Sequence, residues 1–365
     1  RFMRRALALA RRGVGRTSPN PCVGAVVVRG DRIVGEGWHR RAGEDHAEVL
    51  ALRSVGRARE GAPTSTLYVT LEPCCTWGRT PPCTEAIIRA GIRRVVVGTV
   101  DPNPKHRGRG LAKLRQAGIR VTTGVLAEEA RRLNAAFNKW ITSGLPLVTA
   151  KVAVSLDGKM ATRTGDSRWI TDAAARREGH RLRAQADAVM VSAGTVLRDD
   201  PALTLRHGVR GRQPWRVVVD ARGRSPREAR LFTDRWRQRT VVVTTRQSSA
   251  AWRQALALRG VQVLVVAGEG GHVKLRALLV ALGQMEMTSV LVEGGGDFLG
   301  ALLDERLVDR VAFFYAPKII GGRAAAPAVA GRGVARVSEA VQVKNIAWRQ
   351  LPGGQMLAVG EVARR

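Results

Sequence analysis

The chain has 365 residues, 45% of them hydrophobic, which suits a globular protein of two domains. It contains no run of about 18 apolar residues, so we predict no membrane-spanning helix and no membrane partner. Basic side chains outnumber acidic ones by 61 to 30, for a formal net charge of +31. Aromatic residues do not alternate with these basic residues, however, which argues against a nucleic-acid partner.

The first 144 residues show alternating strand and helix patterns. Leu7, Ala8 and Ala10 fit an amphipathic first helix rather than a targeting peptide, because no small-residue cleavage site follows, and we expect a cytoplasmic protein. Strands are predicted over residues 22–29, 33–37, 66–71, 95–98 and 119–122, and helices over 46–54, 82–90, 111–117 and 127–143. Repeated strand–helix crossovers predict a three-layer α/β sandwich.

His46, Glu48, Cys74 and Cys83 carry the clearest chemistry of this half. One imidazole and two thiolates suit Zn²⁺, which keeps a fourth position for water and lowers the pKa of that water toward about 7. A carboxylate two residues after the imidazole can shuttle protons without binding the metal. A His-Ala-Glu triplet followed by two Pro-Cys pairs is typical of zinc deaminases. We therefore predict Glu48 as the catalytic residue and the other three as metal ligands.

The spacing of the two thiols departs from the common Cys-x-x-Cys form, because eight residues separate Cys74 from Cys83. The adjacent Cys75 is a competing ligand, and we prefer Cys74 because Pro73 precedes it, as in the motif. Four cysteines in a chain of this length do not indicate a disulfide framework. Cys22 and Cys75 are predicted to be buried residues or spectators.

Gly144 followed by Leu145 and Pro146 ends the helix predicted over residues 127–143, and we place a domain boundary there, giving domains 1–144 and 145–365. In the second domain, strands are predicted over residues 147–155, 188–191, 216–219, 241–244, 261–266 and 289–292, helices over 176–184, 274–282 and 298–304, and loop over 324–335. This alternation predicts a second α/β domain with a mainly parallel sheet.

A turn over residues 293–296, with the sequence Glu-Gly-Gly-Gly, follows a predicted strand and precedes a predicted helix. Glycines let a ligand approach the backbone closely, and free N–H groups at such a turn can hold a phosphate. Polar segments over residues 151–158, 165–171 and 199–206 belong to the same half. Together they suit a dinucleotide and a phosphate ester, although the turn is not the G-x-G-x-x-G fingerprint.

The chain as a whole resembles the bifunctional deaminase/reductases of riboflavin biosynthesis. The matching motifs are Asn20-Pro21-x-Val23-Gly24-Ala25, Gly35-x-Gly37-x-His39, His46-Ala47-Glu48-Val49, Val69–Cys74, Gly78–Cys83, Asp101–Pro104, Lys151–Gly158, Ser167-x-Trp169-Ile170-Thr171, Asp199–Thr204 and Val292–Gly295. The resemblance implies a cytidine-deaminase-like three-layer sandwich followed by a dihydrofolate-reductase-like α/β domain. The first would deaminate 2,5-diamino-6-ribosylamino-4(3H)-pyrimidinone 5′-phosphate hydrolytically with Zn²⁺, and the second would use NADPH to reduce the ribosyl to the ribityl group.

The resemblance also assigns residues to each site. Asn20 and His39 match substrate contacts in the deaminase pocket. The residues that match NADPH contacts are Val154, Trp169, Thr195, Asp199, Gly295, Gly296, Asp297, Phe298, Leu299, Gly300 and Ala301. The residues that match contacts to the reductase substrate are Lys151, Ser167, Arg183, Leu203, Arg206 and Glu293. Arg183 and Arg206 suit this role because a guanidinium pairs well with phosphate oxygens.

Two stretches depart from the family pattern. Residues 75–77, Cys-Thr-Trp, stand where the family has Ser-His-His or Ser-His-Tyr, so a substrate-contacting His is absent at Thr76. Residues 105–107, Lys-His-Arg, replace small apolar residues. Two alternatives stay open: a nucleic-acid base deaminase with an accessory domain, and a reductase-only or non-catalytic relative with an impaired deaminase pocket. A homo-oligomer is compatible with each of these.

Overall fold

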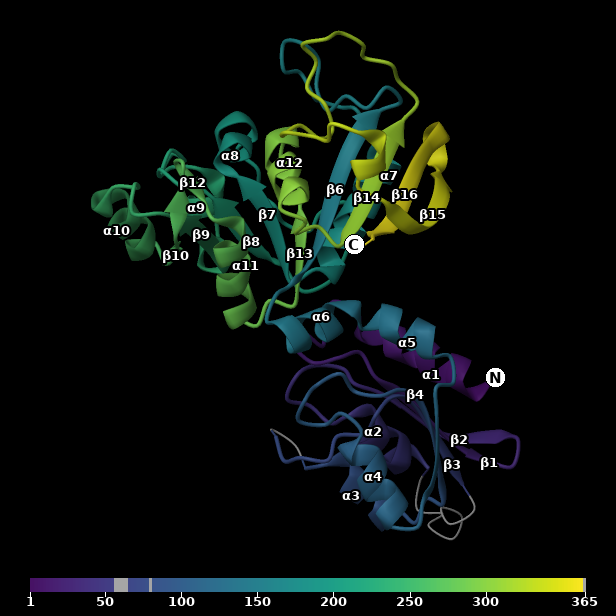
Figure 1. Cartoon of the computed structure of the whole chain (residues 1–365). Coiled ribbons are helices and arrows are strands. Elements are labelled where there is room, and N and C mark those ends of the chain that lie inside the picture. The colour runs from purple at the N-terminus through teal and green to yellow at the C-terminus, as the bar shows by residue number, and fades with distance from the viewer. Residues whose placement is uncertain (56–64, 79–80, 364–365) are drawn as a thin grey trace. The chain divides into compact units, whose positions relative to one another are not determined.

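The computed structural model describes residues 1–55, 65–78 and 81–363, and the chain forms two compact units, Arg1–Gly144 and Leu145–Arg365 (Figure 1). Arg79 and Thr80, which belong to the motif over residues 78–83, lie outside the described residues. Among the helices described, none is both long and apolar enough to cross a membrane.

A five-stranded sheet in the order β2-β1-β3-β4-β5 forms the centre of the first unit. Its strands are β1 (Gly24–Arg29), β2 (Arg32–Trp38), β3 (Thr66–Leu71), β4 (Arg94–Thr99) and β5 (Arg120–Thr123). The hairpin of β1 and β2 is antiparallel, as is the pair of β1 and β3, whereas β3, β4 and β5 run parallel. Parallel neighbours need crossover connections, which the helices between these strands supply.

Helices cover both faces of this sheet, because successive strand residues point to opposite sides. Ala25 and Val27 of β1 pack on the face covered by α2, α3 and α4, and Val26 and Val28 pack on the face covered by α1 and α5. The helices are α1 (Phe2–Ala10), α2 (Ala47–Ser54), α3 (Cys83–Arg89), α4 (Arg109–Gln116), α5 (Ala127–Leu133) and α6 (Ala135–Ser143). The predicted three-layer sandwich is confirmed.

The prediction of a single helix over residues 127–143 is wrong, because Asn134 separates α5 from α6. The buried side-chain amide of Asn134 accepts a hydrogen bond from the backbone N–H of Cys22 at 2.7 Å. It also donates to the backbone carbonyl of Cys22 at 3.0 Å. Hydrophobic periodicity cannot reveal a tie between residues so far apart in the sequence. The end of the second helix is as predicted, with Gly144 in the left-handed region at φ 71°.

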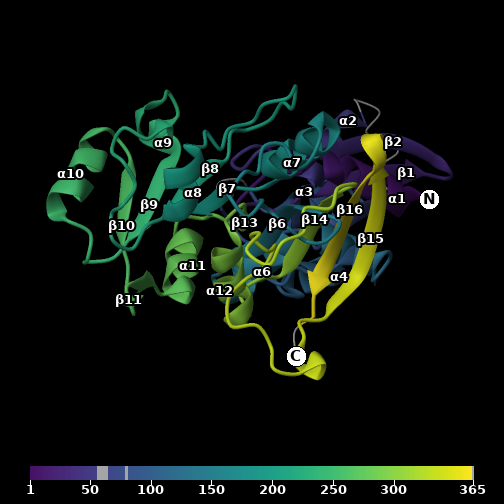
Figure 2. The ribbon, with the colours of Figure 1, turned by 90° about the horizontal axis from the view of Figure 1, so that it is seen from above.

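The second unit is built on a nine-stranded sheet in the order β10-β9-β8-β7-β13-β6-β14-β16-β15. The strands are β6 (Leu147–Ser155), β7 (Ala188–Ser192), β8 (Trp215–Val219), β9 (Thr240–Thr244), β10 (Gln262–Val265), β13 (Ser289–Val292), β14 (Arg310–Ala316), β15 (Val343–Leu351) and β16 (Gln355–Val362), with a separate pair, β11 (Gly268–Glu269) and β12 (His272–Val273). From β10 to β14 all neighbours are parallel, which confirms the mainly parallel sheet. The last two strands, β16 and β15, are antiparallel and form one edge (Figure 2).

Helices lie on both faces of this sheet as well. Apolar residues of α11 and α12 cover one face, and those of α7, α8, α9 and α10 cover the other. These helices are α7 (Ala173–Gln185), α8 (Ala193–Asp199), α9 (Arg230–Thr233), α10 (Ala250–Leu258), α11 (Leu275–Gln284) and α12 (Gly296–Asp304). The sequence reasoning did not identify α8, α10 or the strands β14 to β16. In the edge strand β15 most residues are exposed, so no alternation of apolar and polar residues marks it.

We predict that Asn134→Ala destabilises the first unit by about 2 kcal/mol, because it removes two buried hydrogen bonds, one to the N–H and one to the C=O of Cys22. Urea denaturation of the full chain measures the effect. The matched control is Thr142→Ala on α6, whose exposed hydroxyl bonds only carbonyls of its own helix. This control should change the unfolding free energy by less than about 0.5 kcal/mol. Equal effects of the two substitutions would contradict the role given to Asn134.

Candidate functional site

Three residues that are distant in the sequence meet at one place in the first unit. His46 directly precedes α2, Cys83 is the first residue of α3, and Cys74 lies on the loop that follows β3. Their ligand atoms all lie within 4.8 Å of one another. Nδ1 of His46 is 3.1 Å from Sγ of Cys83 and 3.6 Å from Sγ of Cys74, so this nitrogen faces both sulfurs. The structure thus gathers the predicted ligands into one cluster.

The chemistry of this cluster fits Zn²⁺. Two thiols and one imidazole nitrogen form a set that leaves the fourth tetrahedral position free, as in catalytic zinc sites. Hydrogen bonding with Cys83 and with His46 lowers the pKa of the Cys74 thiol, against the opposing effect of burial, and the same contact between the sulfurs raises the pKa of the Cys83 thiol. The backbone N–H of Cys83 also donates to Sγ of Cys74 at 3.3 Å. A thiolate is the form that binds a metal.

Glu48 lies on the first turn of α2 and is only 3% exposed. Burial raises the pKa of this carboxyl to about 7, although the neighbouring His46 acts in the opposite direction. Its Oε2 atom is buried and has no hydrogen-bond partner among the described residues. An unpaired carboxylate oxygen is costly in a protein interior, which is consistent with a partner supplied by a ligand or a water at the metal.

Asn20 and His39 are joined beside this cluster. Nδ2 of Asn20 is 3.1 Å from Nε2 of His39, and Nδ1 of His39 is 3.1 Å from the backbone carbonyl of Asp45. Because the carbonyl can only accept, Nδ1 carries the proton and Nε2 accepts from Asn20. Burial lowers the pKa of His39, which favours this neutral form. The rings of His39 and His46 meet edge to face with centroids 5.1 Å apart. Both predicted substrate contacts therefore lie near the metal ligands.

The other two cysteines lie outside the cluster formed by the described residues. Sγ of Cys75 is 3.7 Å from Nδ1 of His106, and Sγ of Cys22 is 3.3 Å from the hydroxyl of Thr17. Trp77, one of the residues that depart from the family pattern, is 72% exposed. The departure at residues 75–77 therefore leaves the cluster of His46, Cys74 and Cys83 intact.

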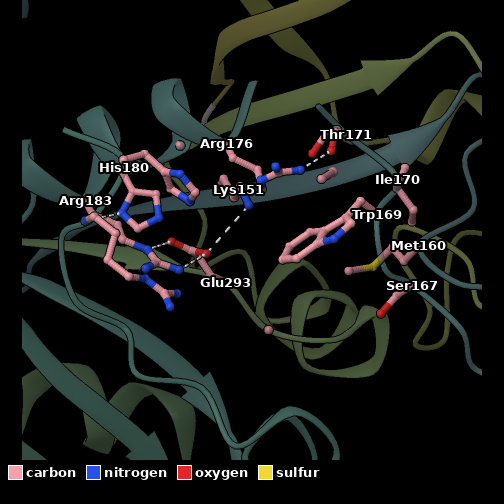
Figure 3. A pocket seen from close by; sticks show the side chains of 15 residues that line it. Lys151, Met160, Ser167, Trp169, Ile170, Thr171, Arg176, His180, Arg183 and Glu293 are labelled. Carbon is pink, nitrogen blue, oxygen red and sulfur yellow. Dashed lines mark hydrogen bonds and ion pairs between the residues drawn. The ribbon is translucent and has the colours of Figure 1, made fainter. Parts of the chain in front are cut away.

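A cavity of about 410 Å³ lies in the second unit (Figure 3). Six predicted residues from five different segments line it. They are Lys151 on β6, Ser167 and Trp169 before α7, Arg183 on α7, Arg206 after α8 and Glu293 after β13. The structure thus brings together most of the predicted contacts to the reductase substrate and one predicted contact to NADPH.

An ion pair at the wall of this cavity joins Arg183 and Glu293 through two parallel hydrogen bonds. Nε donates to Oε1 at 2.6 Å and Nη2 donates to Oε2 at 3.0 Å. Nζ of Lys151 is 3.6 Å from Oε2 of the same carboxylate. Burial alone would raise the pKa of Glu293, but Arg183 and Lys151 hold it well below its usual value. Glu293 therefore stays ionised and orients both cations (Figure 3).

The glycines of the predicted cofactor turn have different surroundings. A Cβ atom added to Gly295 would meet nothing within 4 Å, so this position leaves room for a ligand against the backbone. A Cβ on Gly296 would lie 2.6 Å from the carbonyl of Pro327, and one on Gly300 would lie 2.0 Å from that of Ala330. These two glycines permit close packing of α12 against the following loop.

The remaining predicted residues do not line the cavity. Val154 and Leu203 are buried, and Thr195 and Asp199 lie on α8. Asp297, Phe298, Leu299 and Ala301 lie in the first two turns of α12. Their contacts to NADPH or substrate stay predictions.

Sequence reasoning missed several lining residues, of which Arg176 and His180 on α7 are the most informative. With Arg183 they are spaced by four and three residues, which places all three on one face of the helix. That spacing was visible in the sequence. The guanidinium of Arg176 also stacks over Trp169, 4.3 Å from the ring centroid, and donates to the carbonyl of Thr171 at 2.7 Å.

One known family matches within each of the two units. Residues 1–99 match the cytidine and deoxycytidylate deaminase zinc-binding region, and residues 146–357 match the RibD C-terminal domain. Riboflavin biosynthesis protein RibD of Aquifex aeolicus is 45% identical over 344 residues, which cover 94% of this chain and 93% of that protein. RibD of Escherichia coli is 44% identical over 335 residues, which cover 88% and 89%.

Solved structures show the same similarity. Acinetobacter baumannii RibD, form 2, aligns with a TM-score of 0.88 and 36% identity, covering 99% of this chain and 98% of that one. A diaminohydroxyphosphoribosylaminopyrimidine deaminase/5-amino-6-(5-phosphoribosylamino)uracil reductase of Thermotoga maritima aligns with a TM-score of 0.83 and 37% identity, over 99% and 98% of the two chains.

We predict that Cys83→Ser removes stoichiometric zinc from the purified chain, because it takes one sulfur out of the cluster. Elemental analysis of protein prepared without chelator measures the zinc content. Cys75→Ser is the matched control and should keep its zinc, since Cys75 lies outside the cluster. Full zinc content in Cys83→Ser, or loss of zinc in the control, would mean that the ligand set is wrong.

Proposed function

Because the chain belongs to the RibD family of bifunctional deaminase/reductases of riboflavin biosynthesis, we propose that residues 1–144 carry the deaminase step and residues 145–365 the reductase step. The proposed substrate is 2,5-diamino-6-ribosylamino-4(3H)-pyrimidinone 5′-phosphate, in keeping with the reactions named for the Thermotoga maritima relative. The cluster of His46, Cys74 and Cys83 with the unpaired oxygen of Glu48 is the observation that carries the deaminase assignment.

Hydrolytic deamination requires a nucleophile and a group that moves protons. Zn²⁺, when bound by the cluster, would act as a Lewis acid that makes a hydroxide nucleophile available near neutral pH. Glu48 accepts a proton from the attacking water and later delivers one to the departing ammonia. Its position on the first turn of α2, two residues after His46, fixes the carboxyl next to the cluster, while Oε2 has no hydrogen-bond partner among the described residues.

Asn20 and His39 orient the pyrimidine in this proposal. The hydrogen bond from Asn20 to His39 directs the Nδ2 group toward the ring, so the side-chain oxygen of Asn20 faces the other way and can accept from a substrate N–H. The second hydrogen bond, to the carbonyl of Asp45, prevents His39 from rotating. A fixed pair of this kind positions the reacting carbon without taking part in proton transfer.

The cavity of the second unit suits reduction of a phosphorylated sugar. NADPH, when bound, would supply the hydride. Glu293 holds Lys151 and Arg183 in place, so the Lys151 ammonium can donate to an oxygen of the sugar. The guanidinium of Arg206 lines the cavity and has no hydrogen-bond or ion-pair partner among the described residues, which leaves it for the phosphate. The open position at Gly295 supports approach of the cofactor to the backbone.

We predict that Glu48→Gln lowers the deamination rate by about 10²–10⁴-fold, because the amide cannot accept the proton. Zinc content and reduction of the already deaminated intermediate should not change. Incubation with the diaminopyrimidine phosphate, with and without NADPH, followed by mass analysis of the products measures both steps. Glu85→Gln, a partly exposed carboxylate on α3 paired with Lys113, is the control and should deaminate normally.

Unchanged deamination in Glu48→Gln would contradict the proton-transfer role. A wild-type chain that reduces the intermediate but never deaminates would instead support the reductase-only alternative.

We predict that Arg206→Ala raises the KM of the reductase step for its phosphorylated substrate by about 10–100-fold, because a charge-assisted hydrogen bond is lost. The kcat should change far less, since the guanidinium contacts the phosphate and not the reacting carbon. Arg210→Ala, an exposed arginine four residues further on, is the control. Steady-state reduction of the deaminated substrate measures both constants, and an unchanged KM would remove Arg206 from the phosphate site.

A further inference from the structure

His180 lies at the centre of α7 and lines the reductase cavity, although none of the sequence motifs assigns it a role. It is 5% exposed. Its Nδ1 atom accepts a hydrogen bond from the backbone N–H of Arg206 at 3.0 Å. This contact links a buried helix residue to the backbone of the residue that is proposed to bind the substrate phosphate.

The segment that carries Arg206 has no regular secondary structure, so its conformation depends on side chains from elsewhere. Arg183 donates through Nη1 to the carbonyl of Thr204 at 3.0 Å. The amide oxygen of Gln213 accepts from the N–H of Leu205 at 2.9 Å. Together with the bond from Arg206 to His180, three consecutive residues are each tied through the backbone to a different side chain.

The backbone of this segment needs such ties. Leu203 and His207, on either side of the tied residues, have φ values of 50° and 56°, in the left-handed region that non-glycine residues rarely adopt. Conformations of this kind persist only where the surroundings enforce them. The ring of His207 also meets the ring of His180 edge to face, with centroids 4.8 Å apart. His180 therefore supports two consecutive residues of the segment.

The protonation state of His180 agrees with its role as an acceptor. Burial, together with the cations Arg183 and Arg206, lowers its pKa to about 3, while Glu293 acts in the opposite direction. His207 lies against the ring and also disfavours a second positive charge. A neutral imidazole with an unprotonated Nδ1 can accept the N–H of Arg206, whereas an imidazolium would place N–H against N–H.

We propose that His180 is a positioning residue of the reductase, whose Nδ1 atom fixes the backbone of Arg206 so that the free guanidinium meets the phosphate of the substrate. This inference rests on the proposed function, because it takes Arg206 as the phosphate contact. Arg206 lines the cavity, and within the described part of the chain its guanidinium has no hydrogen-bond or ion-pair partner that could hold it in place. The hydrogen bond from the backbone N–H of Arg206 to His180 is therefore what positions the Arg206 side chain.

Three variants test the proposal in the full chain. In His180→Leu the side chain keeps an apolar bulk but loses the acceptor, and the KM for the phosphorylated substrate should rise about 30-fold with kcat within about twofold. In His180→Asn the amide oxygen takes the place of Nδ1, and the KM should return to within about fivefold of wild type, the remainder reflecting the lost ring contact. In His180→Gln the oxygen lies one bond further out, and the KM should resemble that of the Leu variant.

A double variant shows whether His180 acts through Arg206. If it does, His180→Leu combined with Arg206→Ala should have the KM of Arg206→Ala alone, because the guanidinium that His180 aims is gone. Multiplied effects would overturn the proposal. A normal KM in His180→Leu together with a raised KM in Arg206→Ala would also overturn the proposal. That result would still support Arg206 as the phosphate contact. A normal KM in Arg206→Ala would overturn the phosphate assignment itself, and the inference with it.

Folding is checked within the same molecule. Deamination by the first unit should be unchanged in every His180 variant, and thermal denaturation should show an intact second unit. Should His180→Leu fail to fold, the comparison of Asn with Gln decides the question, because both are polar and only one places an acceptor at the position of Nδ1. Equal KM values for these two variants would overturn the proposal.

The KM of His180→Gln divided by the KM of the wild type should also stay constant from about pH 6 to 9, since His180 is neutral throughout that range.

Discussion

Burial of a carboxyl group is the physical constraint on which both candidate sites depend. A buried carboxylate loses its hydration, and the protein must either supply partners or favour the protonated form. Glu293 has Arg183 and Lys151 as partners and stays ionised, so it serves as a fixed anchor for two cations. Glu48 has a buried oxygen that no described residue hydrogen-bonds, which suits a group that takes up and releases a proton. The same chemical group thus acquires two roles from two environments.

The sheets explain how residues far apart in the sequence reach each other. In the second unit, β13 pairs with β6 so that Val292 lies opposite Ala150, and the residues that follow these two are Glu293, directly after β13, and Lys151 on β6. Parallel register therefore places the carboxylate beside the ammonium before any side chain is considered. In the first unit, the loop after β3 and the starts of α2 and α3 bring the thiols and the imidazole together. Strand ends and helix starts define both sites.

The sequence was sufficient for the elements that have clear periodicity and for the motifs that carry chemistry. The strands β1, β3, β4 and β6 and the metal cluster were all predicted, because apolar runs and His-Cys spacing depend on local sequence. The break between α5 and α6 at Asn134 was not predicted, since it depends on a hydrogen bond to Cys22 that no local pattern reveals. The edge strand β15 was missed for a different reason: most of its residues are exposed, so it shows no apolar pattern. His180 falls between these cases, as its helical spacing with Arg183 is local but its partner on the backbone of Arg206 is not.

The arginines of the reductase cavity divide two tasks that one guanidinium could not perform together. Arg183 is committed to Glu293 and to the carbonyl of Thr204, so its hydrogen-bonding groups are mostly used within the protein. Arg206 keeps its guanidinium free but is held through its backbone, so all of its side-chain donors stay available for a phosphate.

Four cations and one anion line the cavity when both histidines are neutral, an excess of three positive charges. A cavity of this charge favours ligands that carry phosphate, and the phosphorylated sugar and NADPH both do. The carboxylate of Glu293 offsets part of the repulsion among the four cations. His180 and His207, when neutral, line the cavity without adding to that repulsion.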